Sequence, residues 1–408
     1  MPATRGTHEG APGPRGPAGE VFAAFLKLGL TSFGGPIAHL GYFRDEFVVR
    51  RKWIDEAGYA DLVALCQFLP GPASSQTGFA LGLMRAGPLG ALAAFTAFTL
   101  PSAVLLVLFA MGATALGGPL GTGLLHGLKI VAVAVVAQAV WGMARNLTPD
   151  RERASIALAA VLIVVLSASA TGQIGAIAFG ALAGLVFCRN GRPDGAVHLS
   201  FPVSRATGAV LLALFFLLLG LLPLIAAVSQ SQAMALFDAF YRSGALVFGG
   251  GHVVLPLLEA EAVKPGWVTA DAFLAGYGAA QAVPGPLFTF AAYLGAISGP
   301  VPNGIAGAAI ALAGIFLPGF LLLAGMLPFW NRFRTRPAAQ AAMRGANAAV
   351  VGILGAALYD PVWTGAILRP ADFALALTGF VLLTVWKTPP WIVVILLAAA
   401  GAGLALAG

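Results

Sequence analysis

The sequence predicts an all-α polytopic membrane protein made of two homologous repeats of inverted topology. Of its 408 residues 59% are hydrophobic and only 10% are Asp, Glu, Lys or Arg, whereas a soluble domain carries about 25% charged residues. Apolar stretches long enough to cross a hydrocarbon core of about 30 Å recur along the chain. A series of short motifs occurs twice in the same order, which indicates a duplicated fold.

The charged residues are few, and the formal net charge is +7. The basic side chains are spread over short loops between apolar stretches, as topology signals are. The sequence has no basic, aromatic-laced patch, which argues against a nucleic-acid partner. Cys66 and Cys188 lie far apart in apolar surroundings and make no metal-ligand spacing, so we expect neither a metal nor a cofactor.

The duplication is carried by motifs that recur at an offset of 214 to 218 residues. Phe33-Gly34-Gly35 is matched by Phe248-Gly249-Gly250, and Gln67-Phe-Leu-Pro70-Gly71-Pro72 by Gln281-Ala-Val-Pro284-Gly285-Pro286. Further matched pairs are Trp53 and Trp267, Pro101 and Pro318, Gly127 and Gly345, and Gly184 and Gly401. We therefore expect a disordered tail (1–20), a first repeat (21–188), a basic linker with a connecting transmembrane helix (189–237) and a second repeat (238–405).

The connecting helix, at about 208–228, inverts the second repeat if each repeat crosses the membrane an even number of times. Charge placement agrees with this, because the loop at 44–52 carries four basic residues, whereas its counterpart carries Glu259, Glu261 and Asp271 against a single Lys264. Arg369 is left on the outer side. We expect a cytoplasmic N-terminus in the cell inner membrane and about nine crossings, at 90–110, 127–143, 154–170, 173–188, 208–228, 303–327, 345–360, 372–386 and 390–407.

Four further elements are predicted to be re-entrant. Stretches 58–69 and 73–84 would each rise only about 16–18 Å, and Pro70-Gly71-Pro72 joins them, where proline ends a helix and glycine permits a sharp reversal. The same device recurs at Pro284-Gly285-Pro286, and glycines break the first apolar segment of each repeat. Non-helical backbone at membrane depth is tolerated only inside protein or beside a wet cavity. In matched positions of inverted repeats it indicates a transporter's binding site.

The predicted site suits an anion. Helices that begin at Pro72 and Pro286 would direct unpaired N–H groups and positive dipole ends toward the midplane. Lys27 and Arg242 occupy the same position of the two repeats, within apolar segments where a cation is costly, and together they would cage a dianion. The predicted substrate-binding residues are Lys27, Gly34, Gly35, Gln67, Pro70, Gly71, Pro72, Ser74, Ser75, Arg242, Gly249, Gly250, Gly251, His252, Gln281, Pro284, Gly285, Pro286 and Thr289.

Each of these features also has a plainer interpretation. The Pro-Gly-Pro corners could be turns at the membrane edge, and the glycine runs could serve close helix packing. The aliphatic stems of Lys27 and Arg242 could lie along apolar surface while their charged groups reach the membrane–water interface. His39 and His252 could be packing residues rather than proton carriers.

The motifs resemble those of the chromate ion transporter family in its long-chain, two-domain form. The resemblance rests on Phe33-Gly-Gly-Pro-Ile-Ala-His39, on Gln67-Phe-Leu-Pro-Gly-Pro72, on Phe248-Gly-Gly-Gly-His-Val-Val-Leu-Pro256 and on Gln281-Ala-Val-Pro-Gly-Pro-Leu-Phe-Thr-Phe-Ala-Ala-Tyr-Leu-Gly295, and it extends over nearly the whole chain from Val21 onward. It implies transport of chromate, generally efflux from the cytoplasm that confers resistance, with sulfate as the natural look-alike.

We therefore expect a secondary transporter, not an enzyme, that exports a chromate-like oxyanion. A dianion leaving an inside-negative cell gains roughly 4.6 kcal/mol per 100 mV, and the sequence has no nucleotide-binding loop typical of a primary pump. Uptake or exchange of sulfate is the first alternative, and an intramembrane enzyme acting on a lipid-borne group is a remote one. The expected partners are the oxyanion and the lipid bilayer, and a homodimer is left open.

Overall fold

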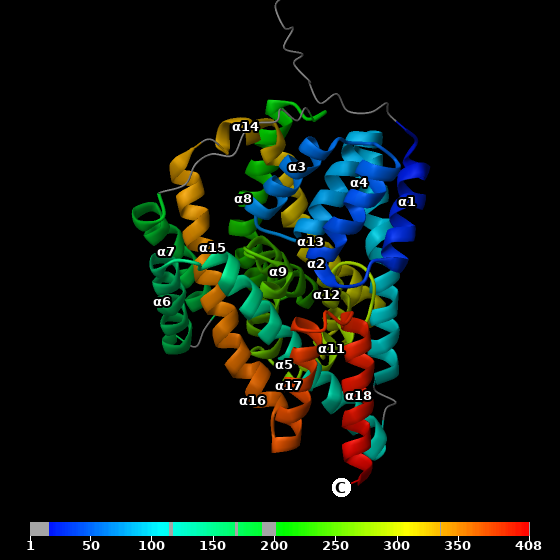
Figure 1. Cartoon of the computed structure of the whole chain (residues 1–408). Helices are drawn as coiled ribbons and strands as arrows, with labels where there is room; N and C mark the ends of the chain where they lie inside the picture. The colour runs from blue at the N-terminus through cyan, green and yellow to red at the C-terminus, as the bar shows by residue number, and fades with distance from the viewer. Residues whose placement is uncertain (1–15, 114–116, 168–169, 190–200, 335, 408) are drawn as a thin grey trace, which may run out of the picture.

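A computed structural model describes residues 16–113, 117–167, 170–189, 201–334 and 336–407. Every regular element within these residues is a helix (Figure 1), which agrees with the predicted all-α class. The predicted tail lies outside the described residues as far as residue 15, and helix α1 already begins at Ala18. Residues 190–200 of the predicted linker also lie outside them.

A first set of elements begins at the N-terminus and contains two glycine-rich breaks. It consists of α1 (Ala18–Thr31), α2 (Gly35–Phe43), a π-helical turn (Arg44–Arg50), α3 (Glu56–Phe68) and α4 (Ala73–Ala113). Between α1 and α2, Gly34 and Gly35 have φ angles of 105° and 80°, which glycine adopts without a steric cost. Helix α4 is itself interrupted by non-helical backbone at Ala86 and Gly87. Stretches 58–69 and 73–84 are therefore short helices separated by an irregular corner.

A second set repeats this order of elements. It consists of α9 (Gln232–Ala245), a 3-10 turn (Gly251–Val253), α10 (Val254–Leu258), a π-helical turn (Glu259–Val263), α11 (Ala270–Ala280), a second 3-10 turn (Leu287–Thr289), α12 (Phe290–Ile297) and α13 (Gly304–Met326). Its two irregular corners contain Gly249, Gly250 and Gly285, all with positive φ. Helix α8 (Arg205–Ser229) leads into this set.

The remaining helices follow the two sets. After the first come α5 (Gly118–Leu147), α6 (Arg151–Ser167) and α7 (Ala170–Phe187); after the second come a 3-10 turn (Leu327–Phe329), α14 (Trp330–Phe333), α15 (Pro337–Ala357), a π-helical turn (Leu358–Trp363), α16 (Thr364–Ala366), α17 (Pro370–Thr384) and α18 (Pro390–Ala407). These helices complete the membrane-embedded body of the protein.

Six helical stretches among the described residues are long and apolar enough to cross a membrane. They are Ala73–Ala113, Gly118–Leu147, Arg205–Ser229, Gly304–Phe333, Pro337–Ala366 and Pro390–Ala407, and each contains one predicted crossing. The other three predicted crossings fall on α6, α7 and α17, which have 17, 18 and 15 residues and so rise only about 22–27 Å. The total of nine crossings therefore stays a prediction.

Glycine contacts interlock the helices that follow the two sets. A Cβ on Gly401 of α18 would lie 2.8 Å from the Gly127 Cα of α5, and a Cβ on Gly345 of α15 would lie 2.6 Å from the Gly184 Cα of α7. The sequence repeat matches Gly127 with Gly345 and Gly184 with Gly401. Each contact therefore joins one half of the chain to the other, and small residues allow the helix backbones to approach this closely.

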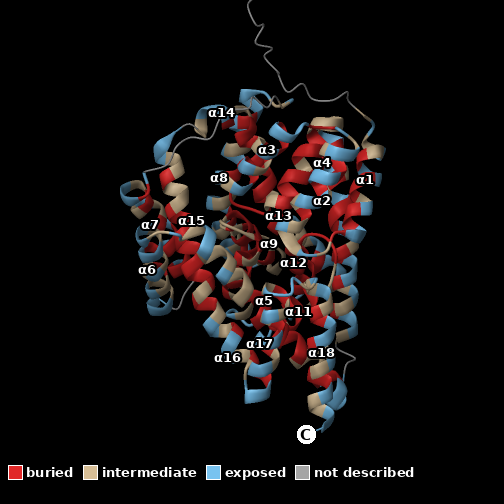
Figure 2. Ribbon diagram, viewed as in Figure 1, coloured by how far each residue is buried: buried red, intermediate tan, exposed pale blue. Residues whose placement is uncertain are grey.

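The core lies where the broken elements meet, and the lipid-facing surface lies outside it. Figure 2 shows buried residues concentrated along the inner helices, whereas α8 and α6 are largely exposed on their outer faces. In the apolar window of Arg205–Ser229 only 11% of residues are buried, against 78% for Gly304–Phe333. Helix α13 is therefore central, and α8 lies at the periphery.

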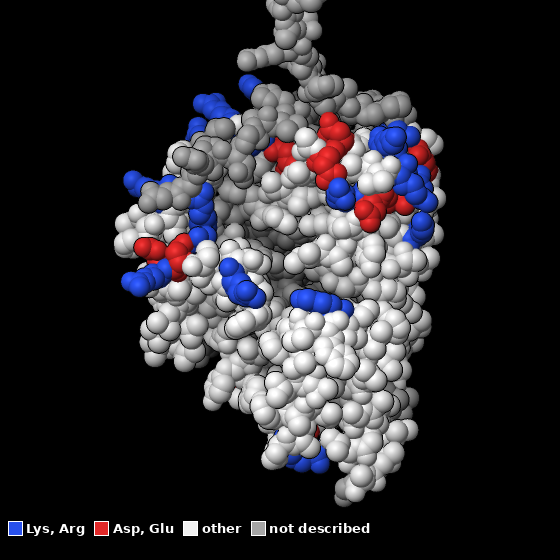
Figure 3. Space-filling model, in the orientation of Figure 1, with Lys and Arg blue, Asp and Glu red and all other residues white. Residues whose placement is uncertain are grey.

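Charged side chains gather at one end of the molecule. Figure 3 shows Lys and Arg concentrated where α14 lies and where α1 begins, while the opposite end carries few of them on this face. Ion pairs fix part of this charged end, including Arg85 with Glu20 at 2.9 Å and Arg334 with Asp61. The opposite end contains the start of α5 and the end of α18 (Figure 1).

Replacing Gly401 with Leu should lower the melting temperature of the protein in detergent, because the side chain would separate α18 from α5. Overpacking of a close contact costs about 1–3 kcal/mol. Gly403→Leu is the matched control, since a Cβ on Gly403 of the same helix meets nothing within 4 Å. Equal melting temperatures for the two variants would show that this glycine contact does not stabilise the fold.

Candidate functional site

Crossed backbone hydrogen bonds join each Pro-Gly-Pro corner to the first break of the opposite set. The Gly71 N–H donates to the Val247 carbonyl at 2.7 Å, and the Gly285 N–H donates to the Ser32 carbonyl at 2.9 Å. Ser32 follows α1 and Val247 lies just beyond α9. Each corner is therefore bonded to the end of the first helix of the other set. Because irregular backbone at membrane depth needs partners inside the protein, these bonds hold the four breaks in one cluster.

Glycine is required at both corners by backbone conformation and by close packing. Gly71 has a φ angle of 123° and Gly285 one of 97°, which L side chains rarely adopt. A Cβ at Gly71 would lie 3.2 Å from the Gly319 Cα, and one at Gly285 would lie 2.9 Å from the Ser102 Oγ. Each corner therefore also packs against the long helix of the other set, one residue after Pro101 in α4 and one residue after Pro318 in α13.

The glycine-rich breaks of the two sets also contact each other. A Cβ on Gly251 would lie 3.0 Å from the Pro36 Cγ and 3.9 Å from a methyl group of Leu287. The structure thus brings together all four segments that the sequence predicts to be irregular. The N-termini of α2 and α4, and the 3-10 turn that leads into α12, meet in this cluster. Unpaired N–H groups at helix N-termini favour an anion.

Four buried polar side chains of the first set have an atom without a hydrogen-bond partner in this cluster. They are the Oγ of Ser32 and of Ser75, the Oγ1 of Thr99 and the Oε1 of Gln76, and each residue is at most 4% exposed. The other end of the Gln76 amide donates to the Gly319 carbonyl at 2.9 Å, which ties α4 to α13. A buried polar group without a partner costs about 1–3 kcal/mol, so the three hydroxyl groups are expected to bind a ligand or water.

The second set carries apolar residues at most of the matching positions. The pairs are Ser32 and Val247, His39 and Val254, Ser74 and Phe288, Gln76 and Phe290, and Thr99 and Phe316. Thr289, opposite Ser75, keeps a hydroxyl, but this group donates to the Pro286 carbonyl at 2.7 Å. The free hydrogen-bonding capacity therefore comes from one repeat. Sequence reasoning missed Ser32 and Thr99 because it compared the residues that the repeats share; the signal was the difference between the repeats.

Lys27 and Arg242, predicted to form a cationic cage, pair with carboxylates of their own sets. The Lys27 Nζ lies 3.8 Å from the Glu46 Oε2, and the Lys27 side chain is 56% exposed. Arg242 donates to both oxygens of Glu261, at 2.6 and 2.9 Å, and to Asp238 at 3.0 Å. Glu46 and Glu261 lie in the two π-helical turns, each 19 residues after its cation. The duplicated cation is therefore part of a duplicated ion pair, and we do not include it in the proposed anion site.

Glu46 is surrounded by further basic residues at the charged end of the molecule. Its Oε1 accepts from the Arg51 Nε at 2.6 Å and also from Arg50. Burial acts to raise the pKa of this carboxyl, but the hydrogen bonds from Arg51 and Arg50 outweigh burial and hold the pKa below its usual value. The carboxylate therefore stays ionised and fixes the π-helical turn.

The other predicted site residues contribute shape or lie apart from the unpartnered hydroxyls. The corner prolines Pro70, Pro72, Pro284 and Pro286 are buried, and Gln67 is exposed. Gln281 donates to the Tyr277 carbonyl at 3.4 Å, and the Nδ1 of His252 lies 2.7 Å from the Tyr277 hydroxyl. The Ser74 Oγ lies 3.4 Å from the Nδ1 of His39. Whether these residues bind substrate stays a prediction.

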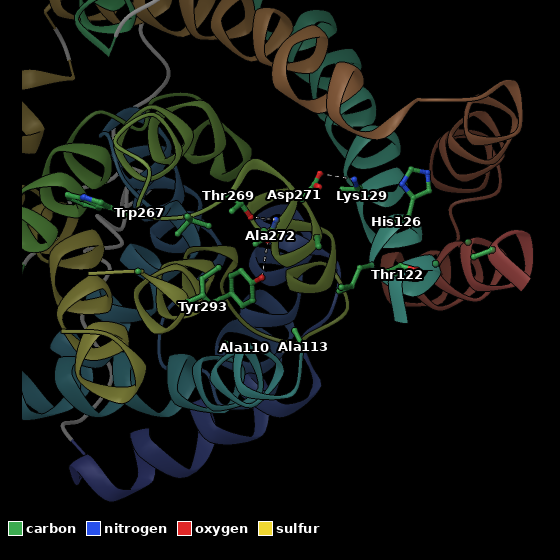
Figure 4. A pocket seen from close by; sticks show the side chains of 18 of the residues that line it. Ala110, Ala113, Thr122, His126, Lys129, Trp267, Thr269, Asp271, Ala272 and Tyr293 are labelled. Carbon is green, nitrogen blue, oxygen red and sulfur yellow. Dashed lines mark hydrogen bonds and ion pairs between the residues drawn. The ribbon is translucent and has the colours of Figure 1, made fainter. Parts of the chain in front are cut away.

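A separate cavity of about 860 Å³ lies at the end of the molecule where α5 begins. Figure 4 shows Thr122, His126 and Lys129 of α5 beside Asp271 of α11, with Tyr293 of α12 on another wall. Sequence reasoning did not connect Lys129 with Asp271. The spacing of the three polar residues along an otherwise apolar helix was the available signal.

The sequence matches the family model described as chromate transporter twice, over residues 19–185 and 234–404. This chain belongs to the chromate transporter family. It is 30% identical to a chromate transport protein of Pseudomonas aeruginosa, over 98% of this chain and 95% of that protein. It is 29% identical to a probable chromate transport protein of Synechococcus elongatus over 82% of each chain. It is 25% identical to a chromate transport protein of Cupriavidus metallidurans, over 82% of this chain and 80% of that protein.

No solved structure gives a significant match to this member of the chromate transporter family. The family and the apolar helices together make the chain a multi-pass membrane transport protein. They confirm the family resemblance that the duplicated motifs indicate.

In this chromate transporter family member, Arg242→Gln should lower stability far more than Lys27→Gln. Removing the arginine leaves two largely buried carboxylates without a cation, which costs about 3–5 kcal/mol. The exposed Lys27 pair contributes only about 0–1 kcal/mol. Thermal unfolding of the two purified variants in detergent measures the difference.

The double variant Arg242→Gln, Glu261→Gln should recover part of the lost stability, because one of the unpaired carboxylates is removed. Equal melting temperatures for Lys27→Gln and Arg242→Gln would contradict the assignment of Arg242 to a buried ion-pair network.

Proposed function

We propose that this member of the chromate transporter family is a secondary transporter that exports chromate, a tetrahedral dianion, across the plasma membrane. The observation that carries the proposal is that crossed backbone bonds hold the four breaks together, and that Ser32, Ser75 and Thr99 of the same set of elements have buried hydroxyl groups without a partner. N–H and O–H groups that donate to an anion form hydrogen bonds about twice as strong as neutral ones. The curated relatives are chromate transport proteins, and this similarity supports chromate as the substrate.

We interpret the two sets of elements as inverted repeats, with α8 as the odd crossing between them. The common order of helix, break and π-helical turn supports this interpretation, as do the two separate matches to one family model. The positive-inside rule assigns the charged end of the molecule to the cytoplasm. The N-terminus is then cytoplasmic, and the cavity beside Lys129 faces the outside.

In this interpretation substrate movement depends on the long helices α4 and α13. Both contain an internal proline, Pro101 and Pro318, next to the corner of the other set. Proline removes a backbone hydrogen bond and provides a place where a helix can bend. Tilting one set against the other opens the cluster to one side of the membrane at a time. The glycine contacts between α5 and α18 and between α7 and α15 keep the halves associated during this movement.

The membrane potential is sufficient to drive export. Moving one charge through about 100 mV changes its free energy by about 2.3 kcal/mol, so a dianion gains roughly 4.6 kcal/mol on leaving an inside-negative compartment. Export then needs no co-transported ion, whereas uptake of the same dianion requires one.

Proteoliposomes loaded with chromate should therefore lose it faster under an inside-negative potential than at zero potential, in vesicles whose protein orientation is known.

Ser75→Ala should raise the KM for chromate about tenfold, because a hydrogen bond to a charged ligand contributes about 1.5–3 kcal/mol. Chromate flux as a function of concentration measures both effects.

Ser243→Ala is the matched control for Ser75→Ala. Ser243 is also buried, but its Oγ is satisfied by the Ala239 carbonyl at 2.8 Å, so its removal should leave the KM unchanged. A chromate efflux rate that does not change with the membrane potential would refute potential-driven export. Inward sulfate flux without chromate efflux would instead support the uptake alternative.

The inverted arrangement predicts that Asp45 and Lys264 lie on opposite sides of the membrane. The Asp45 side chain is 75% exposed, and Lys264 is exposed in the matching region of the second set. In a background with Cys66 and Cys188 replaced by Ala, an impermeant maleimide should label Lys264→Cys in intact cells and Asp45→Cys in inside-out vesicles. Labelling of both variants from one side would exclude inverted repeats.

A further inference from the structure

The cavity near the start of α5 has a polar stripe along an otherwise apolar wall. Thr122, His126 and Lys129 follow one another at helical spacing, and all three line the cavity (Figure 4). Lys129 is the only Asp, Glu, Lys or Arg of α5 before Arg145, and it is only 9% exposed. A cation at such a position costs solvation and is usually functional.

Lys129 pairs with a carboxylate that an anionic ligand can replace. The Lys129 Nζ lies 2.8 Å from the Asp271 Oδ1, but the Asp271 side chain is 77% exposed, so water solvates this carboxylate once a second anion takes its place at Lys129. Asp271 lies in the first turn of α11, whose N-cap Thr269 accepts from the Ala272 N–H at 3.2 Å. The positive end of this helix stabilises the Asp271 carboxylate without Lys129.

The other charges around the cavity also favour an anion. Its charged lining consists of Lys129, Arg369 and Asp271, two cations against one carboxylate. His126 lines it too, and the His126 Nε2 lies 3.1 Å from the Asp372 Oδ1. Asp372 is fully buried behind the wall, accepts two backbone N–H groups at the start of α17, and lies 3.8 Å from Arg369. Its charge is therefore satisfied locally, and Lys129 remains the cation available to a ligand.

We propose that this cavity is a second oxyanion site, in which a divalent tetrahedral oxyanion replaces Asp271 at Lys129. The class of ligand rests on the proposed function. Tyr293 of α12 lines the cavity and lies one helical turn beyond Thr289, so the site adjoins the cluster of breaks. In the proposed orientation it receives the exported anion on the outer side. Asp271 then competes for Lys129 and promotes release.

The test places a reporter thiol in the cavity and uses sulfate as the probe. In a background with Cys66 and Cys188 replaced by Ala, Thr122→Cys is purified in detergent, and its rate of modification by an anionic methanethiosulfonate reagent is measured. Sulfate should slow this reaction in a saturable way. Lys129→Gln should weaken the protection about tenfold or more, whereas Asp271→Asn should preserve or tighten it.

Three controls make the result decisive. Lys387→Gln removes an exposed lysine that does not line the cavity, and sulfate protection should be unchanged. Lys129→Arg keeps the charge and should keep the protection, which covers the case in which Lys129→Gln fails to fold. Ser75→Ala should impair chromate flux without altering protection, so failure of the central site and failure of this one are distinguishable.

Two results would overturn the proposal. One is an absence of sulfate protection in the chain with Lys129 and Asp271 intact. The other is an equal loss of protection in Lys129→Gln and Asp271→Asn, which would show that the two residues form only a structural ion pair.

Discussion

The structure depends on one constraint: backbone that leaves the helix at membrane depth must find its hydrogen bonds inside the protein. Each set of elements contains two glycine-rich breaks, and neither set supplies the acceptor for the glycine N–H of its own Pro-Gly-Pro corner. The Gly71 N–H uses the Val247 carbonyl, and the Gly285 N–H uses the Ser32 carbonyl. Each half therefore completes the other. The glycine contacts of α5 with α18 and of α7 with α15 extend the same mutual dependence to the periphery.

The two sets of elements share the geometry of the central cluster and differ in its chemistry. Both sets turn at the same positions, yet the free hydroxyl groups of Ser32, Ser75 and Thr99 belong to the first set. At matching positions of the sequence the second set has aromatic residues, such as Phe288 and Phe316, whose ring centroids lie 5.8 Å apart. Aromatic side chains exclude water, and hydrogen bonds to an anion are stronger where water is excluded. In the proposed function, an anion in this cluster is therefore expected to lie closer to the first set than to the second.

The positions of the breaks could be predicted because proline and glycine act on the local backbone. The partners of the breaks could not, since the bond between Gly71 and Val247 joins residues that no local rule connects. Helices of 15 to 18 residues, such as α6 and α17, left the crossing count open because their lengths are close to the thickness of the hydrocarbon core.

The carboxylate partners of Lys27 and Arg242 could have been predicted from the sequence. Glu46 and Glu261 follow these two cations at the same distance along the chain, but they were assigned to loops as topology signals. The polar character of the first set was also visible in the sequence. Ser74 and Ser75 were predicted from it, but Ser32 and Thr99 were overlooked, because a repeat is found from the residues that its copies share and these two are matched by Val247 and Phe316.

In the proposed function the carrier must return empty after it has released a dianion, and this requirement explains why its cations are neutralised. A buried cation left without a partner in the empty state would carry a large desolvation cost. Arg242 avoids this cost through Asp238 and Glu261, and Lys129 avoids it through Asp271. Hydroxyl groups at the central cluster lose far less when the ligand leaves, because a neutral polar group is cheaper to desolvate than a charge. In the proposed function, neutral donors at the central cluster and an exchangeable carboxylate at the cavity beside Lys129 therefore allow a dianion to be bound and released without trapping the empty protein in one conformation.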